Sequence, residues 1–140
     1  DTITYNALIS ACEKVQHWRE ALQLLQGMRR ADLEPTVITY NAVISACEKG
    51  SEWMRALDMF GAMRSQAVLA DLVSFNAAAS ACQRGHQSGA ALRLLAEASS
   101  AGVQPDVVTC MSVAASCSGG GRLGEVPAVL ESLRSRAAFL

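Results

Sequence analysis

The feature that most constrains this chain is an internal repeat of 35 residues. The stretch TYNALISACEK begins at Thr4, and the nearly identical stretch TYNAVISACEK begins at Thr39. The same register continues to SFNAAASACQR around Asn76 and, more weakly, to TCMSVAASCSG around Met111. A fixed period of this length indicates a repeat protein, in which similar units stack along one axis.

The second copy predicts two helices joined by a tight turn. Apolar residues recur at helical spacing in its first half, at Tyr40, Val43, Ile44 and Cys47. We expect Gly50 to end this helix as a C′ residue with a positive φ. A second helical stripe follows, made of Trp53, Ala56, Leu57, Phe60 and Met63. Pro35 and Pro105 keep the second helix of a repeat from running into the next one.

A single hairpin of this kind cannot bury its own apolar stripe, whereas stacked hairpins bury one another's. We therefore predict an all-α fold, a right-handed α-solenoid of antiparallel helix-turn-helix repeats. The period gives one array with repeats at 2–36, 37–71 and 72–106 and a partial, degenerate repeat at 107–140. The last repeat is degenerate because it contains a glycine run at 119–121 and Pro127. We expect the chain to be a piece of a longer protein, since it begins at Asp1 with the apparent tail of an earlier repeat.

Composition excludes several classes of site. Lys and Arg number 12 against 13 Asp and Glu, so bulk charge gives no support for a nucleic-acid partner. No long apolar run is present, and we expect no membrane contact. Four cysteines occupy one slot of successive repeats, too far apart for a shared zinc ion or a disulfide, and we expect them to be packing residues: Cys12, Cys47, Cys82 and Cys117.

We also expect no cofactor, no metal and no catalysis. His17 and His86 do not share a slot, and no Cys/His pair has an oriented third partner. The stretch SGGGRLG lacks the Lys-Ser/Thr ending of a phosphate-binding loop. Trp18 and Trp53 fall on predicted second helices, where packing is expected rather than base stacking.

A 35-residue hairpin that opens with V-x-T-Y-N-x-L-I and closes with x-P-D resembles the pentatricopeptide repeat (PPR) family. Here the signature appears as TITYNALISACEK, VITYNAVISACEK, LVSFNAAASACQR and VVTCMSVAASCSG, over essentially the whole chain. The resemblance implies sequence-specific binding of single-stranded RNA, about one base per repeat. It further implies a role in RNA processing, editing, stability or translation in the mitochondrion or chloroplast, with other proteins as additional candidate partners.

The resemblance also assigns site residues. The fifth and last positions of each repeat, which select the base, are Asn6 with Thr36, Asn41 with Asp71, and Asn76 with Asp106. The second positions, which sandwich the base, are Ile3, Ile38, Val73 and Val108. The basic position near the end of the first helix, which meets phosphate, holds Lys14, Lys49 and Arg84. In the family Asn with Asp favours uracil, so repeats two and three would prefer uracil and repeat one a pyrimidine.

The residues themselves allow plainer interpretations. An Asn amide offers a donor and an acceptor to a base edge, but Asn also favours helix starts. The basic residues can complement a helix C-terminal dipole, and the Asp residues can cap the following helix while also orienting Asn. The rival function is a protein-binding scaffold of the tetratricopeptide type, which has a period of about 34 residues.

Overall fold

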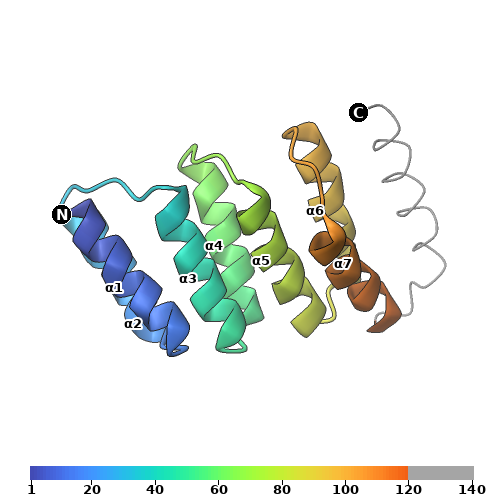
Figure 1. Cartoon of the computed structure of the whole chain (residues 1–140), viewed down its shortest axis with the longest axis horizontal. Coiled ribbons are helices and arrows are strands. Elements are labelled where there is room, and N and C mark those ends of the chain that lie inside the picture. The colour runs from blue at the N-terminus through green and yellow to red at the C-terminus, as the bar shows by residue number, and fades with distance from the viewer. Residues whose placement is uncertain (120–140) are drawn as a thin grey trace.

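The structure is a computed structural model that describes residues 1–119. These residues form seven α-helices of 13 residues each and no strand. The helices are α1 (Thr2–Lys14), α2 (Trp18–Arg30), α3 (Val37–Lys49), α4 (Trp53–Ser65), α5 (Leu72–Arg84), α6 (Ser88–Ser100) and α7 (Val107–Gly119). They stand side by side along one axis from α1 to α7 (Figure 1). The predicted all-α stack is therefore confirmed.

The division into repeats stays a prediction, although α1, α3, α5 and α7 begin 35 residues apart. The second half of the expected fourth repeat, with Pro127, lies outside the described residues. Among the seven described helices, none is both long and apolar enough to cross a membrane. Residues 1–119 also contain no group of three or more His, Cys, Asp or Glu side chains arranged to hold a metal ion.

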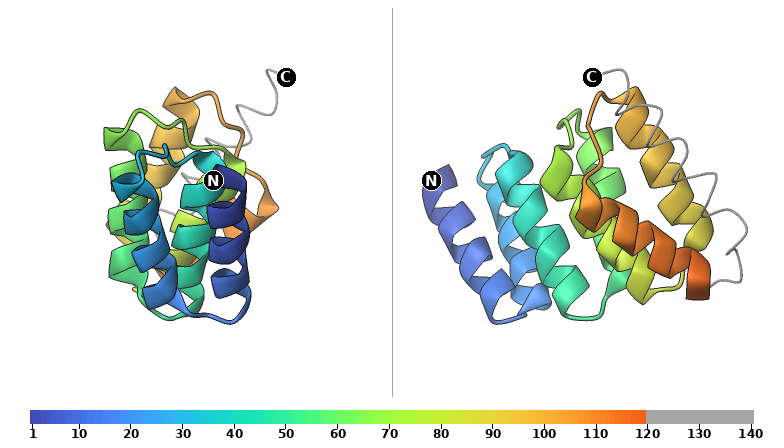
Figure 2. Two further views of the ribbon diagram at one scale, coloured as in Figure 1. Left: turned by 90° about the vertical axis from the view of Figure 1, so that its left-hand side faces the viewer. Right: turned by 45° about the vertical axis from the view of Figure 1, so that its right-hand side comes forward.

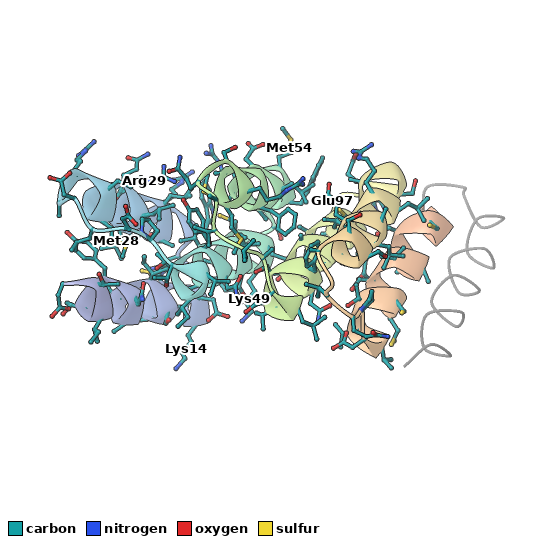
Figure 3. The ribbon with its side chains drawn as sticks, turned by 90° about the horizontal axis from the view of Figure 1, so that it is seen from above. Lys14, Met28, Arg29, Lys49, Met54 and Glu97 are labelled. Atoms are coloured by element: carbon teal, nitrogen blue, oxygen red, sulfur yellow. The ribbon has the colours of Figure 1, made fainter. Side chains whose placement is uncertain are left out.

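The helices form two layers, because each hairpin places its two helices on opposite sides. Seen from above, α1, α3, α5 and α7 make one layer and α2, α4 and α6 the other (Figure 3). An end-on view shows the same two columns (Figure 2). Successive odd-numbered helices pack on one another, and each even-numbered helix packs on the odd-numbered helices before and after it. Every hairpin is thus completed by the next one.

The core lies between the layers and follows the predicted stripes. On α3, Tyr40, Val43 and Ile44 are fully buried, and on α4 Phe60 and Met63 are buried. Phe60 meets Phe75 of α5 edge to face, with ring centroids 5.2 Å apart, which joins consecutive hairpins. Aromatic contacts of this geometry stabilise a core beyond simple burial of area.

The cysteines act as small packing residues, as predicted. Cys47, Cys82 and Cys117 are fully buried, and Cys12 is half-buried. Burial raises the pKa of the Cys47 and Cys82 thiols to about 11, so both stay protonated near neutral pH. A protonated, buried thiol is a poor nucleophile and a poor metal ligand.

The expected positive φ of Gly50 is wrong. Gly50 has φ −81° and serves as the C-cap of α3, and the left-handed conformation falls on Ser51, with φ 64°. The backbone N–H of Glu52 donates to the carbonyl of Cys47 at 2.8 Å, and that of Ser51 donates to Glu48 at 3.1 Å. This pattern is a Schellman motif shifted by one residue from the expected position. The backbone conformation at 50 therefore does not require glycine.

Packing between hairpins requires glycine at this position instead. A Cβ on Gly50 would lie 2.4 Å from Cδ1 of Trp18, and a Cβ on Gly85 would lie 2.3 Å from Cδ2 of Trp53. Each Trp begins an even-numbered helix, and each Gly ends the odd-numbered helix of the following hairpin. The indole rings thus pack against glycine, and the prediction that they serve packing is confirmed.

We expect Gly50→Ala and Gly85→Ala to lower the free energy of unfolding by about 1–3 kcal/mol each, because a rigid indole must move away from the new methyl group. Urea denaturation of each variant measures the change. Gly61→Ala is the matched control, since a methyl group at that position would have nothing within 4 Å of it. Because Gly61 is inside α4, that substitution should stabilise by roughly 0.5–1 kcal/mol. Unchanged stability of Gly50→Ala and Gly85→Ala would contradict the packing argument.

Candidate nucleic-acid interface

One asparagine sits at the same place on each of the first three odd-numbered helices. Asn6, Asn41 and Asn76 are the fifth residues of α1, α3 and α5 counted from the repeat starts at 2, 37 and 72. All three side chains are half-buried. Each amide is therefore only partly open to solvent, and each also accepts a hydrogen bond from the next hairpin.

Each of the last two amides is held from both ends. Nδ2 of Asn41 donates to Oδ1 of Asp71 at 3.1 Å, and Nδ2 of Asn76 lies 3.4 Å from both carboxylate oxygens of Asp106. The Oδ1 atom of Asn41 accepts a hydrogen bond from the Ser74 hydroxyl. The structure therefore brings together the predicted fifth and last positions of the second and third repeats.

A hydroxyl residue also engages the other two asparagines. The Thr109 hydroxyl donates to Oδ1 of Asn76, and the Thr39 hydroxyl donates to Oδ1 of Asn6 at 2.6 Å. The first hairpin lacks the contact between Asn and the last residue of the repeat, since the exposed Thr36 makes no hydrogen bond to Asn6. Sequence reasoning missed the hydroxyl residues. The signal was present, because Thr39, Ser74 and Thr109 recur at the 35-residue period.

The two aspartates also cap helices. The Asp71 side chain accepts the backbone N–H of Ser74 at the start of α5, and Asp106 accepts that of Thr109 at the start of α7. The capping role and the contact with Asn therefore coexist in one carboxylate. These bonds act on acidity as well. The hydrogen bond from the backbone N–H of Thr109 is the main cause of the lowered pKa of Asp106. Partial burial acts to raise the pKa of Asp71, but the hydrogen bonds from Ser74 and Asn41 outweigh it and lower the pKa.

Beside the asparagines runs a row of exposed aliphatic side chains. The exposed fractions are 80 % for Ile3, 62 % for Ile38, 60 % for Val73 and 55 % for Val108. Large apolar side chains that stay in contact with water do not stabilise the fold. A periodic row of them therefore indicates a binding surface. Met111, at the fourth Asn position, is 66 % exposed and has no hydrogen-bonding group for a base edge. The row therefore continues into α7, but the polar contact does not.

Two of the three basic residues predicted to contact phosphate form ion pairs with glutamates. Lys49 forms an ion pair with Glu13 of the preceding hairpin. Arg84 forms the equivalent pair with Glu48, with Nε 2.6 Å from the carboxylate. Within residues 1–119 no ion pair or hydrogen bond involves the Lys14 side chain, which points away from the even-numbered helices in Figure 3.

The acidic partners were missed by sequence reasoning. Ser45 donates to Glu13 at 3.0 Å and Ser80 donates to Glu48 at 2.7 Å, so each carboxylate has a hydroxyl and a cation on the next hairpin. Partial burial of Glu13 acts to raise its pKa, but the hydrogen bonds from Lys49 and Ser45 outweigh it and lower the pKa. The available signal was the dipeptide Glu-Lys at 13–14 and 48–49. The family pattern assigns a partner, phosphate, only to the Lys of this dipeptide and says nothing about the Glu.

We expect the free energy of unfolding to fall in acid. The folded-state pKa of Asp71 and of Asp106 lies below the ordinary value of 3.8, so protons bind the unfolded chain more tightly. The stabilisation is complete above that value and is lost as the pH falls through the folded pKa. Thermal unfolding from about pH 7 to about pH 2 measures this dependence. The double variant Asp71→Asn/Asp106→Asn keeps a capping side chain at both positions and should lose less stability as the pH falls. The control Asp58→Asn, at an exposed site in the middle of a helix, should keep the pH dependence of the wild-type chain.

Comparisons with known proteins agree with this geometry. Residues 1–49 match the PPR repeat family and residues 38–67 match the PPR repeat. No curated protein sequence matches the chain. Among solved structures, the PPR domain of Arabidopsis thaliana protein-only RNase P 1, in complex with tRNA, superposes with a TM-score of 0.82 at 19 % identity. That match covers 95 % of this chain and 72 % of that one.

A second similar structure is the pentatricopeptide repeat protein PPR10 from maize. It has a TM-score of 0.74 at 27 % identity, over 98 % of this chain and 20 % of PPR10. The structure of PPR10 in complex with an 18-nt psaJ RNA element gives 0.79 at 24 % identity, over 96 % and 20 % of the two chains. This chain thus spans about a fifth of the length of PPR10. The repeat period, the helical hairpins and the matches together show that the chain belongs to the pentatricopeptide repeat family.

Proposed function

We propose that this chain binds single-stranded RNA with base selectivity, at about one nucleotide per hairpin. The observation that carries the proposal is the recurring arrangement of a half-open Asn amide with exposed aliphatic side chains beside it. An aliphatic pair such as Ile38 and Val73 offers apolar contact to both faces of a base. The amide between them then meets the base edge. The RNA complex of PPR10 and the tRNA complex of the RNase P domain support this proposal by likeness of fold.

The polar contacts favour uracil at the second and third hairpins. Asn41 and Asn76 each use one Nδ2 proton on an aspartate and retain a second for an oxygen acceptor on a base. Asp71 and Asp106 add acceptor capacity beside it, so that a base N–H can be bound directly or through water. Asn6 pairs with no carboxylate, and we propose a pyrimidine there. We assign no selective contact to Met111.

We further propose that these hairpins bind RNA without cleaving it, as part of a longer protein that acts on RNA in a mitochondrion or chloroplast. The organelle is inferred from where members of the family generally act. The tetratricopeptide alternative has less support, because the matched family, the period and the Asn/Asp pairs all favour RNA over a protein ligand.

Fluorescence anisotropy with short single strands tests the function. We expect oligouridylate to bind more tightly than oligoadenylate or a scrambled strand. Asn41→Ala and Asn76→Ala should each weaken binding to oligouridylate about three- to tenfold, because each removes one hydrogen bond. Asn41→Ala should leave the fold intact, which circular dichroism checks. Equal affinity of the folded wild-type chain for all strands would overturn base selectivity.

The ion pairs give a second prediction, on salt dependence. Lys14→Ala should weaken binding to every RNA alike and reduce the slope of log K against log salt by about 0.7, the value expected for one phosphate on a single strand. Lys49→Ala should have a smaller effect, because Glu13 already neutralises that cation. Glu13→Gln and Glu48→Gln should tighten binding and steepen the slope, since they release Lys49 and Arg84 for phosphate. Unchanged slopes in both Gln variants would show that these cations do not reach RNA.

A further inference from the structure

Each of the three asparagine amides contacts a hydroxyl residue in the first turn of the next hairpin. Thr39, Ser74 and Thr109 each lie three residues after the N-cap of an odd-numbered helix. They are the most deeply buried polar residues of this surface, with exposed fractions of 0 %, 0 % and 1 %. Burial of a hydroxyl is costly unless its hydrogen bonds are satisfied, so its partners are well defined.

The hydrogen bonds of each hydroxyl indicate what it does. The oxygen of Thr39 accepts the backbone N–H of Thr36 at 3.0 Å, and Ser74 accepts that of Asp71 at 3.1 Å. A hydroxyl has one proton to donate, and its shortest contact with an acceptor is in each case with Oδ1 of the preceding Asn. The Ser74 hydroxyl also lies 3.0 Å from Oδ1 of Asp71. The amide oxygen therefore faces the buried hydroxyl, and Nδ2 of Asn41 faces the exposed Asp71.

The carboxylate gives an independent check on this orientation. An ionised Asp accepts hydrogen bonds and cannot donate, so the atom of Asn41 that faces Asp71 must be Nδ2. The contacts with the hydroxyl and with the carboxylate thus agree on one amide orientation at the second and third hairpins. At the first hairpin, Thr39 alone sets the orientation, because Nδ2 of Asn6 has no partner within residues 1–119.

Amide orientation decides which pyrimidine is accepted. Uracil presents O4, an acceptor, where cytosine presents its N4 amino group, a donor. An outward Nδ2 can donate to uracil O4, whereas an outward Oδ1 would instead accept from cytosine N4. We propose that Thr39, Ser74 and Thr109 are positioning residues that make Asn6, Asn41 and Asn76 select uracil over cytosine. This inference rests on the proposed binding of RNA and adds three residues that do not touch the base.

The test compares matched variants at two hairpins. Thr39→Val keeps the shape of the side chain and removes the hydroxyl, whereas Thr39→Ser keeps the hydroxyl. Ser74→Ala and Ser74→Thr form the second pair, and Thr is the residue this chain uses at 39 and 109. Affinities are measured for oligouridylate and for a set of strands that each carry one cytosine in place of uracil. Thermal unfolding of every variant verifies that the chain is folded.

We expect Thr39→Val to reduce the preference for uracil over cytosine about three- to tenfold at one nucleotide, because an amide free to rotate serves both bases. Ser74→Ala should have a smaller effect at a neighbouring nucleotide, since Asp71 still holds Nδ2. Thr39→Ser and Ser74→Thr should retain the preference.

Three outcomes overturn the inference, and they are distinguishable. If the wild-type chain prefers uracil and Thr39→Val keeps that preference while folded, the hydroxyl does not position the amide. If Thr39→Ser loses the preference as fully as Thr39→Val, side-chain shape rather than the hydroxyl is responsible. If the folded wild-type chain binds no RNA or binds without base preference, the proposed function fails first and the inference fails with it.

Discussion

The structure depends on burial of each hairpin's apolar stripe against the following hairpin. An isolated pair of 13-residue helices could not bury its apolar stripe completely, whereas in the stack Tyr40, Ile44 and Met63 are fully buried. This dependence fixes the register, because the contacts repeat only if each hairpin advances by the same 35 residues. The row of equivalent asparagines is a geometric result of that register.

Stacking and recognition use some of the same atoms. Asp71 caps α5, holds Asn41 of the preceding hairpin and lies at the exposed edge of the surface. Glu13 and Glu48 likewise join consecutive hairpins through Lys49 and Arg84. The near-neutral net charge of −1 follows in part from this arrangement, since cations on the surface are matched by carboxylates one hairpin earlier. Affinity for a polyanion is therefore a local property of this surface and cannot be judged from bulk charge.

The sequence predicts the helices well because helical periodicity and the 35-residue period reinforce one another. It also predicts which residues lie together, since Asn41 and Asp71 do meet. It fails where an outcome depends on side-chain geometry between hairpins. The pattern relates the glycine at 50 to backbone conformation, but the indole of Trp18 is what requires it. The pattern likewise relates Lys49 and Arg84 to phosphate and misses their carboxylate partners, because a one-dimensional pattern does not show which neighbours compete for a cation.

The contact of Trp with Gly has a consequence for how such units can be combined. A hairpin with Trp at its second-helix start accepts as successor only a hairpin with Gly at the end of its first helix, as Gly50 and Gly85 provide. The third hairpin has Ser88 at the Trp position, and the first has Val15 at the Gly position. The units are therefore not freely interchangeable modules. Exchanging the first hairpin with the third to rewrite an RNA target would place Trp53 against Val15 and Ser88 against Gly50. That exchange would create a clash at one junction and a void at the other, even if every base-facing residue were chosen correctly.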